Sequence, residues 1–129
     1  LRNYGRELGF AFQLVDDVLD YRGEAGTLGK NTGDDLREGK MTLPVILALK
    51  QATPAERETI VSALGRIDTG PDQLGQVVAI FERYDTLGRT IVRAETHVRQ
   101  ATDALRSLPA SEMKDILAGV AEFTASRAY

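Results

Sequence analysis

Apolar residues recur at helical spacing along most of the chain, and glycine or proline separates one run from the next. Side chains three and four residues apart share one face of a helix, so each run predicts an amphipathic helix. The longest run, residues 87–108, alternates steps of four and three residues, as helices of antiparallel bundles do. The sequence contains no β-strand alternation or tandem repeat, and it therefore predicts an all-α helical bundle. The expected helices cover residues 2–21, 42–49, 53–65, 70–81, 87–108 and 113–120.

Local signals at two helix starts support these boundaries. Thr53 and Glu56 have the spacing of a capping box, in which each side chain accepts a hydrogen bond from the backbone N–H of the other residue. Thr42 is expected to cap the helix that follows it, with Pro44 in the first turn.

The helix over residues 2–21 is apolar on most of its surface but carries one polar stripe. The stripe consists of Gln13, Asp16, Asp17 and Asp20, whose spacing of i, i+3, i+4 and i+7 is one helix face. A helix that is apolar nearly all round is buried, so we expect the stripe to face an interior cavity. The alternative is a solvated acidic face, but such faces usually mix acidic with basic side chains.

A cation in that cavity would remove an electrostatic cost. Asp16 and Asp20 lie one turn apart and would repel each other by about 0.2–0.5 kcal/mol even on an exposed helix. Burial raises this cost, and a bound cation cancels it. Because no His or Cys lies nearby, the carboxylates favour a hard, oxygen-seeking ion, and we expect Mg²⁺.

Composition excludes several classes of function. The chain has 129 residues, enough for one domain, and its net charge of −3 gives no basic surface for nucleic acid. Absence of cysteine excludes disulfides and thiolate metal sites, and no apolar run is long enough for a transmembrane segment. These features predict a single all-α domain over residues 1–129 in a reducing, cytoplasmic setting. His97, the only histidine, has no partner at ligand spacing, and we expect a surface or interface residue.

The first residues suggest that the chain begins partway through a larger protein. Leu1 is not methionine, and the helical pattern is already established at Tyr4. Gly5 and Gly9 lie on the same side of the predicted helix as the acidic stripe, where small residues leave room beside the carboxylates or allow another helix to approach.

A glycine-rich loop over residues 22–40 follows the acidic helix. Lys30 and Lys40 each come directly after a glycine, and Arg37 lies between them. Glycines let the backbone approach a ligand, and lysines offer charge to phosphate. A basic loop after an acidic helix is expected to hold a Mg²⁺–diphosphate complex, and to be mobile until that ligand binds. The alternative is an exposed connector whose glycines only serve turns.

These segments resemble a known family. The run Phe12-Gln13-Leu14-Val15-Asp16-Asp17-Val18-Leu19-Asp20 is similar to the second aspartate-rich motif, DDxxD, of the trans-isoprenyl diphosphate synthases, or polyprenyl synthetases. Residues 28–30 and 33–44 are similar to the segment that follows it there. The resemblance implies the all-α isoprenoid synthase fold. It also implies condensation of an allylic diphosphate with isopentenyl diphosphate, and the run 35–44 favours the long-chain type.

The resemblance assigns four residues to the metal site. Asp16, Asp17 and Asp20 match the aspartates that bind Mg²⁺ and, through it, the allylic diphosphate. Asp35 matches an outer aspartate near the metal ions.

Four further residues match substrate-binding positions. Phe12 corresponds to the aromatic residue beside the isoprene unit, and Gln13 to a glutamine near the substrates. Lys30 and Lys40 correspond to the diphosphate-binding lysines, and with Asp16 and Asp17 they form the expected catalytic set.

The family's first aspartate-rich motif and its isopentenyl-diphosphate arginines are absent. The chain therefore resembles the C-terminal portion of a synthase subunit, which we expect to be inactive alone and to form a homodimer. Three alternatives remain: a terpene cyclase of the same fold, a non-catalytic partner subunit of a heteromeric synthase, and a bundle that serves only as an interaction module.

Overall fold

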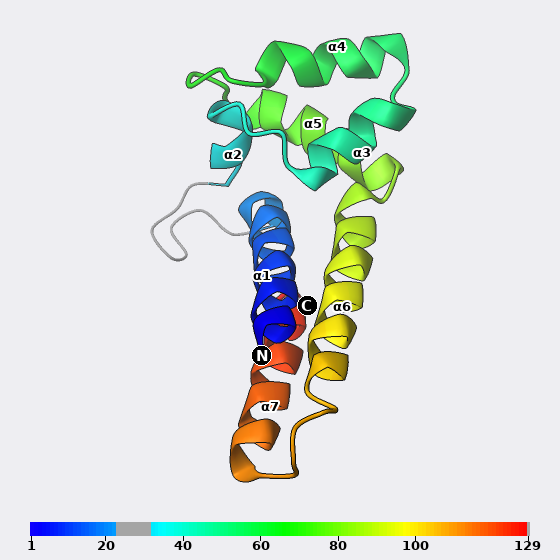
Figure 1. Ribbon diagram of the computed structural model, residues 1–129. Helices are drawn as coiled ribbons and strands as arrows, with labels where there is room; N and C mark the ends of the chain where they lie inside the picture. The colour runs from blue at the N-terminus through cyan, green and yellow to red at the C-terminus, as the bar shows by residue number, and fades with distance from the viewer. Residues whose placement is uncertain (23–31, 129) are drawn as a thin grey trace. The chain divides into compact units, whose positions relative to one another are not determined.

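The computed structural model describes residues 1–22 and 32–128, and all regular structure in these ranges is helical, as the sequence predicts (Figure 1). None of these helices combines the length and the apolar character that a membrane span needs. The described helices are α1 (Arg2–Arg22), α2 (Asp34–Arg37), α3 (Leu43–Gln51), α4 (Pro54–Ala63), α5 (Pro71–Arg83), α6 (Thr86–Ala104) and α7 (Glu112–Ser126).

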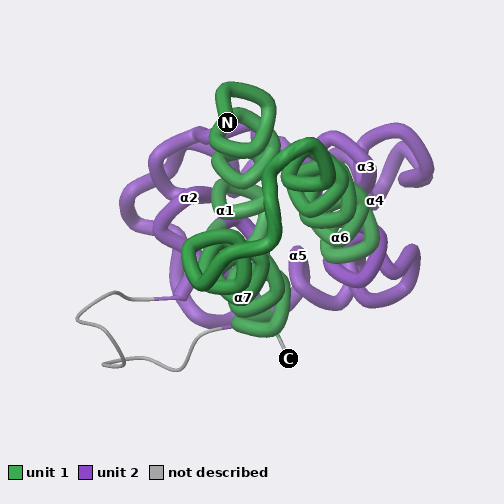
Figure 2. The backbone as a smooth tube through the Cα atoms, turned by 60° about the horizontal axis from the view of Figure 1, so that its bottom comes forward, with its two compact units in different colours: residues 1–16, 90–129 green, residues 17–89 purple. Residues whose placement is uncertain are grey.

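The chain divides into two compact units, coloured green and purple in Figure 2. Unit 1 consists of Leu1–Asp16 and Thr90–Tyr129, and unit 2 of Asp17–Arg89. Helices α1 and α6 each contribute residues to both units. The prediction of a single domain over the whole chain stays a prediction.

Unit 1 is a packing of three helices, the first part of α1, most of α6, and α7, which lie side by side in Figures 1 and 2. The Tyr4 hydroxyl donates a hydrogen bond of 2.8 Å to the Leu117 carbonyl, which joins α1 to α7. Three of the core residues are alanines, and small side chains allow close helix approach. The buried cluster consists of Tyr4, Ala11, Val98, Ala101, Leu105 and Ala121.

The long apolar pattern of α6 is confirmed by burial. Every member from Leu87 to Leu105 at the predicted spacing is buried. The helix itself is shorter than its pattern, because it begins at Thr86 and ends at Ala104. Leu105 lies beyond the helix and still packs into the core of unit 1.

Unit 2 contains the end of α1 and the helices α2 to α5. Helices α3, α4 and α5 contact one another. The Tyr21 ring of α1 meets the Phe81 ring of α5 edge-on, with 4.9 Å between their centroids. Both rings are buried, so this contact fixes the end of α1 in the core of unit 2.

The two predicted caps have different outcomes. At the start of α4, Thr53 Oγ1 accepts a hydrogen bond from the Glu56 N–H, and Glu56 Oε1 accepts one from the Thr53 N–H, so the capping box is confirmed. Thr42 does stand at the N-cap of α3, but its side chain makes no capping hydrogen bond. Pro44 in the first turn has no N–H to satisfy, which reduces the need for such a bond.

The apolar surface of α1 is buried only in part by the described residues. Phe10 and Phe12 are about half exposed, whereas Val15 and Val18 are fully buried. In unit 1, α6 and α7 cover only part of the circumference of α1, so some of its apolar side chains remain partly exposed. The predicted helix near residues 113–120 is present as α7, but Met113 and Val120 are exposed for the same reason.

Candidate functional site

The acidic stripe lies on α1, but its members have different surroundings. Asp17 and Asp20 are buried, with 6% and 7% of their surfaces exposed. The Asp16 side chain is 43% exposed and Gln13 is exposed. Within the described residues α1 therefore turns only two of the four side chains into the fold, and the expectation that the whole stripe faces an interior cavity stays a prediction. Asp16 is the carboxylate of the motif most accessible to a ligand.

Asp20 holds residues 33–35, within the predicted glycine-rich loop, against the end of α1. Its side-chain oxygen Oδ2 accepts a hydrogen bond of 3.1 Å from the backbone N–H of Asp35. Its backbone carbonyl accepts another of 2.9 Å from the N–H of Gly33. Helix α2 begins at Asp34, so both bonds fix the first turn of this short helix to α1. Sequence separation of 15 residues explains why the pattern alone did not reveal this contact.

Residues 33–40 are held by further hydrogen bonds within unit 2. The Gly65 N–H donates to the Leu36 carbonyl at 2.8 Å, and Leu36 is fully buried. Arg37 Nε donates to the Thr69 carbonyl at 3.0 Å. The prediction of a glycine-rich loop is therefore wrong for this part of the chain. Asp34–Arg37 form a helical turn, and these hydrogen bonds fix its position. We call residues 33–40 the platform.

The platform needs glycine at its first residue. Gly33 has φ of +86°, and a Cβ atom there would lie 2.6 Å from Leu74 Cδ1. We expect Gly33→Ala to lower the free energy of unfolding by about 1–2 kcal/mol, because an L-residue disfavours this left-handed conformation. Gly75→Ala is the matched control: this residue lies within α5, where a Cβ would meet nothing within 4 Å. The control should gain roughly 0.5–1 kcal/mol. Urea unfolding of both variants measures the difference, and equal stabilities would contradict the account.

Lys40 presents a positive charge at the end of the platform. Its Nζ atom lies 3.1 Å from Glu38 Oε2 and 3.5 Å from Asp35 Oδ1. The hydrogen bond to Glu38 and the charge of Asp35 raise the pKa of Lys40 above its usual value, so the ammonium stays charged at neutral pH. The side chain is 57% exposed and can reach an anion. Lys30, the other predicted diphosphate ligand, lies outside the described residues.

Tyr21 stays neutral beside three carboxylates. Burial raises the pKa of its phenol well above the usual value, and the charges of Asp20, Asp35 and Asp17 raise it further. A neutral phenol adds no fourth negative charge to this part of unit 2.

This pKa shift predicts a loss of stability in alkali. The folded state favours the neutral phenol, so stability is full below the ordinary tyrosine pKa of about 10 and falls as the pH rises above it. Tyr21→Phe should lack this pH-dependent loss of stability, because phenylalanine has no phenol to ionise. Urea unfolding from about pH 9 to about pH 11 is expected to show a steeper loss for the unsubstituted protein than for Tyr21→Phe. Parallel curves would show that Tyr21 is not the group responsible.

The carboxylates of α1 fit a hard divalent ion that is shared with a ligand. Among the residues described, no three His, Cys, Asp or Glu side chains come together as a complete metal cage. Mg²⁺ does not require one, since it usually keeps several waters and takes one or two carboxylates together with substrate phosphates. Asp16, Asp17 and Asp20 are the motif residues of α1 that could supply those carboxylates, and Asp16 is the most exposed of them.

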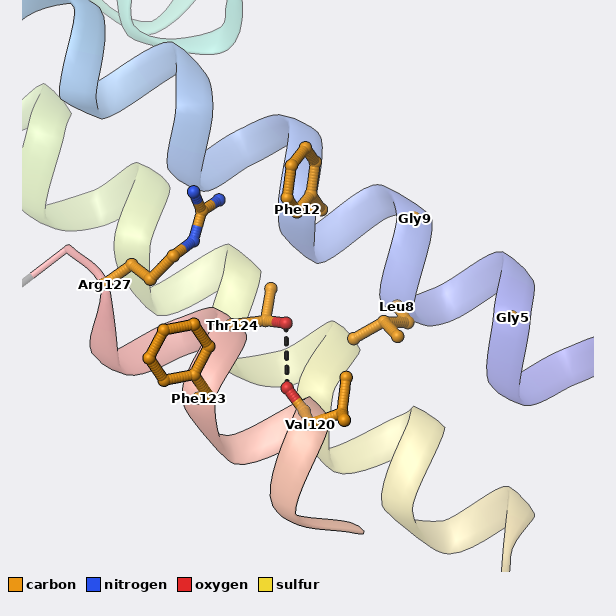
Figure 3. Close-up of a pocket in the computed structure, with 8 residues that line it drawn as sticks. All are labelled: Gly5, Leu8, Gly9, Phe12, Val120, Phe123, Thr124 and Arg127. Atoms are coloured by element: carbon orange, nitrogen blue, oxygen red, sulfur yellow. Dashed lines mark hydrogen bonds between the residues drawn. The ribbon is translucent and has the colours of Figure 1, made fainter. Parts of the chain in front are cut away.

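An apolar hollow of about 510 Å³ lies within unit 1, between α1 and the C-terminal helix α7 (Figure 3). Phe12, which the resemblance assigns to a position beside an isoprene unit, lines it. Gly5 and Gly9 also line it, and a Cβ at either position would meet nothing within 4 Å. These glycines keep the α1 side of the hollow open. The remaining lining residues are Leu8, Val120, Phe123, Thr124 and Arg127.

Sequence reasoning missed two polar contacts within unit 1. Arg127, directly after α7, contacts Asp16 with 3.3 Å between Nη2 and Oδ1. His97 Nδ1 lies 2.5 Å from Glu7 Oε2, and its ring packs against Phe10 at 5.3 Å. His97 is therefore a half-buried residue between α6 and α1. The partners of Arg127 and His97 are far apart in sequence, so no local signal reveals them.

Comparison with known proteins agrees with this arrangement. Residues 1–81 match the family model described as polyprenyl synthetase. The chain belongs to the polyprenyl synthetase family. The matched range contains the acidic stripe of α1 and the platform, and so it includes the residues on which the sequence prediction rests.

Individual relatives are longer than this chain. It is 41% identical to the octaprenyl diphosphate synthase of Haemophilus influenzae, over 100% of this chain and 39% of that protein. It is 40% identical, with the same coverage, to a short chain isoprenyl diphosphate synthase of Methanothermobacter thermautotrophicus. The chain thus spans about two-fifths of the length of these relatives.

A solved structure confirms the fold. The polyprenyl synthase of Caulobacter crescentus, solved in complex with calcium and isoprenyl diphosphate, superposes with a TM-score of 0.88 at 40% identity. The match covers 99% of this chain and 39% of that one. The prediction of an all-α isoprenoid synthase fold is therefore confirmed for the part that this chain represents.

Proposed function

We propose that this chain is the C-terminal part of a long-chain trans-polyprenyl diphosphate synthase, a transferase that condenses an allylic diphosphate with isopentenyl diphosphate. The observation that supports it most strongly is the joining of the acidic motif to the platform. Asp20 of the motif binds the backbone of Asp35, and Asp35 lies beside the ammonium of Lys40. A carboxylate region and a cation are thereby part of one supported structure, as a metal-bound diphosphate requires.

Each residue has a defined role in this proposal. Asp16 and Asp17 would hold Mg²⁺, and the bound ion would supply a positive charge that stabilises the departing diphosphate. Lys40 binds the diphosphate through its exposed ammonium, and Lys30 is proposed to do the same. Asp20 and Asp35 hold the platform against α1. We also assign both residues to the metal site.

Two exposed residues of α1 complete the half-site. Phe12 and Gln13 lie on the exposed side of α1, where they would contact the substrates. Phe12 contributes to the hollow of unit 1, which would shield an allylic cation from water.

The test is a condensation assay with radiolabelled isopentenyl diphosphate and an allylic diphosphate, in the complete protein that contains this chain. We expect Mg²⁺-dependent formation of polyprenyl diphosphate by the complete protein and none by the 129-residue chain alone. A cyclised hydrocarbon product would instead support a terpene cyclase. Activity only after a second subunit is added would support a partner subunit. If neither product forms under any of these conditions, an interaction module would be the remaining alternative, and the proposal would be contradicted.

A homodimer is the expected assembly. Unit 1 leaves large apolar side chains exposed on α1 and α7, among them Phe10, Met113 and Phe123. Apolar surface of this kind is usually covered by another part of the protein or by a second subunit. Sedimentation equilibrium of the complete protein measures the assembly state directly.

A further inference from the structure

Arg37 is a cation of the predicted diphosphate loop to which the proposed function gives no role. It is the last residue of α2, and its side chain is only 20% exposed, whereas that of Lys40 is 57% exposed. Its Nε atom donates to the Thr69 carbonyl at 3.0 Å. Its Nη1 atom donates to the Thr32 carbonyl at 2.8 Å and to Asp34 Oδ1 at 3.2 Å. Most of the donors of this guanidinium therefore serve contacts within unit 2.

The carbonyl that accepts from Nε belongs to a segment that is itself fixed. Residues 64–70 join α4 to α5, and we call them the α4–α5 loop. Thr69 is buried, and its hydroxyl donates to the Ala63 carbonyl at the end of α4 at 3.1 Å. Its N–H donates to the Arg66 carbonyl, also at 3.1 Å. The Thr69 carbonyl is thus an acceptor of defined position, to which Arg37 ties the platform.

The α4–α5 loop meets the platform at a second point, Gly65. The Gly65 N–H donates to the Leu36 carbonyl, and a Cβ atom at Gly39 would lie 3.3 Å from Gly65 Cα, so the two backbones approach closely. Figure 1 shows α2 beside the segment that joins α4 to α5. The loop therefore holds the platform through a backbone contact at Gly65 and through the side chain of Arg37.

The position of Lys40 depends on α2. The Lys40 N–H donates to the Asp35 carbonyl at 2.9 Å, and the Gly39 N–H donates to the Leu36 carbonyl at 3.1 Å. These two bonds fold the end of the platform back onto α2, and the Lys40 ammonium lies beside the Asp35 carboxylate. A shift of α2 would therefore move the ammonium that is proposed to bind the diphosphate.

We propose that Arg37 is a positioning residue, which ties α2 to the α4–α5 loop and thereby sets the place of the Lys40 ammonium. The inference rests on the proposed function, in which Lys40 binds the diphosphate. Arg37 acts through Lys40 and does not itself contact the ligand. Lysine cannot replace it, because an ammonium lacks the planar fork that reaches the Thr69 and Thr32 carbonyls at the same time.

Calorimetry of the complete protein, with inorganic pyrophosphate and Mn²⁺ as probes, tests the inference. Lys40→Ala should weaken pyrophosphate binding about 10-fold, the effect of losing one hydrogen bond between charged groups. Arg37→Lys keeps the positive charge and should still weaken binding about fivefold. The double variant should bind no more weakly than Lys40→Ala alone, because the effects of residues that act through one another do not add.

Arg57→Lys is the matched control. Arg57 Nη1 also donates to a backbone carbonyl of unit 2, that of Leu49 at 3.0 Å, and this contact does not involve the platform. The control should leave pyrophosphate binding unchanged.

Two results would overturn the inference and leave the proposed function intact. One is an affinity of Arg37→Lys within about twofold of the unsubstituted protein, even with lower stability in urea, since Arg37 would then only support the fold. The other is a loss in the double variant equal to the product of the two single losses, since Arg37 would then act independently of Lys40. Unchanged affinity in Lys40→Ala, or no Mn²⁺-dependent pyrophosphate binding by the unsubstituted protein, would instead contradict the proposed function.

Discussion

Asp16→Ala in the complete protein is expected to lower the turnover of the proposed condensation about 100-fold or more, the scale of losing one group that stabilises charge in the transition state. Asp16 is the most accessible carboxylate of the acidic motif, and in our proposal it holds the metal ion that stabilises the departing diphosphate. Its contact with Arg127 is partly exposed, so its removal should cost at most about 1 kcal/mol of folding stability. Loss of activity without unfolding is the expected combination.

Steady-state kinetics at saturating substrate, over a range of Mg²⁺ concentrations, measures this effect. Asp103→Ala is the control, because Asp103 is an exposed aspartate of α6 that pairs only with nearby Arg106 in the described contacts. Its turnover should match that of the unsubstituted protein. Turnover of Asp16→Ala within a few-fold of that control would show that Asp16 does not hold a catalytic metal.

Asp20→Ala is expected to have the opposite profile, with a large effect on stability. Removal of the Asp20 side chain leaves the buried N–H of Asp35 without this acceptor. An unsatisfied buried donor costs about 1–3 kcal/mol, so the free energy of unfolding should fall by that amount. The platform that carries Lys40 should loosen at the same time, because this bond fixes its first turn to α1.

Asp20→Asn separates the structural role from a metal-binding role. Asparagine keeps a side-chain oxygen that can accept the Asp35 hydrogen bond, but it loses the negative charge. We expect Asp20→Asn to recover most of the stability that Asp20→Ala loses, as measured by urea unfolding, and to slow hydrogen exchange at Asp35 relative to Asp20→Ala. If both variants are as stable as the unsubstituted protein, the Asp20–Asp35 bond does not support the platform.

Helices and caps could be predicted from sequence because their causes are local. The apolar pattern of α6 and the capping box at Thr53 depend on residues within a few positions of one another, and both are confirmed. The all-α fold follows from such patterns added together. The acidic motif was found in the same way, because its aspartates lie on successive turns of one helix.

Contacts between distant residues could not be predicted in this way. Arg127 and Asp16 are separated by 111 positions, so nothing in either neighbourhood indicates the pair. The exposed fraction of a side chain could not be predicted for a related reason. Whether Phe12 is buried depends on which helices cover that side of α1, and the periodicity of the sequence does not contain that information. The turn Asp34–Arg37 was missed because its glycine-rich surroundings favour a loop, whereas hydrogen bonds from Gly33 and Asp35 to Asp20 hold it in place.

The most direct test of the central claim is the position of the metal ion. Crystals of the complete protein, grown with Mn²⁺ and inorganic pyrophosphate, would reveal the ion by its anomalous scattering. We predict an ion coordinated by an Asp16 carboxylate oxygen, with pyrophosphate oxygens and waters in the rest of its shell and Lys40 Nζ beside the pyrophosphate. An ion and pyrophosphate bound elsewhere, with no contact to α1 or Lys40, would contradict the account.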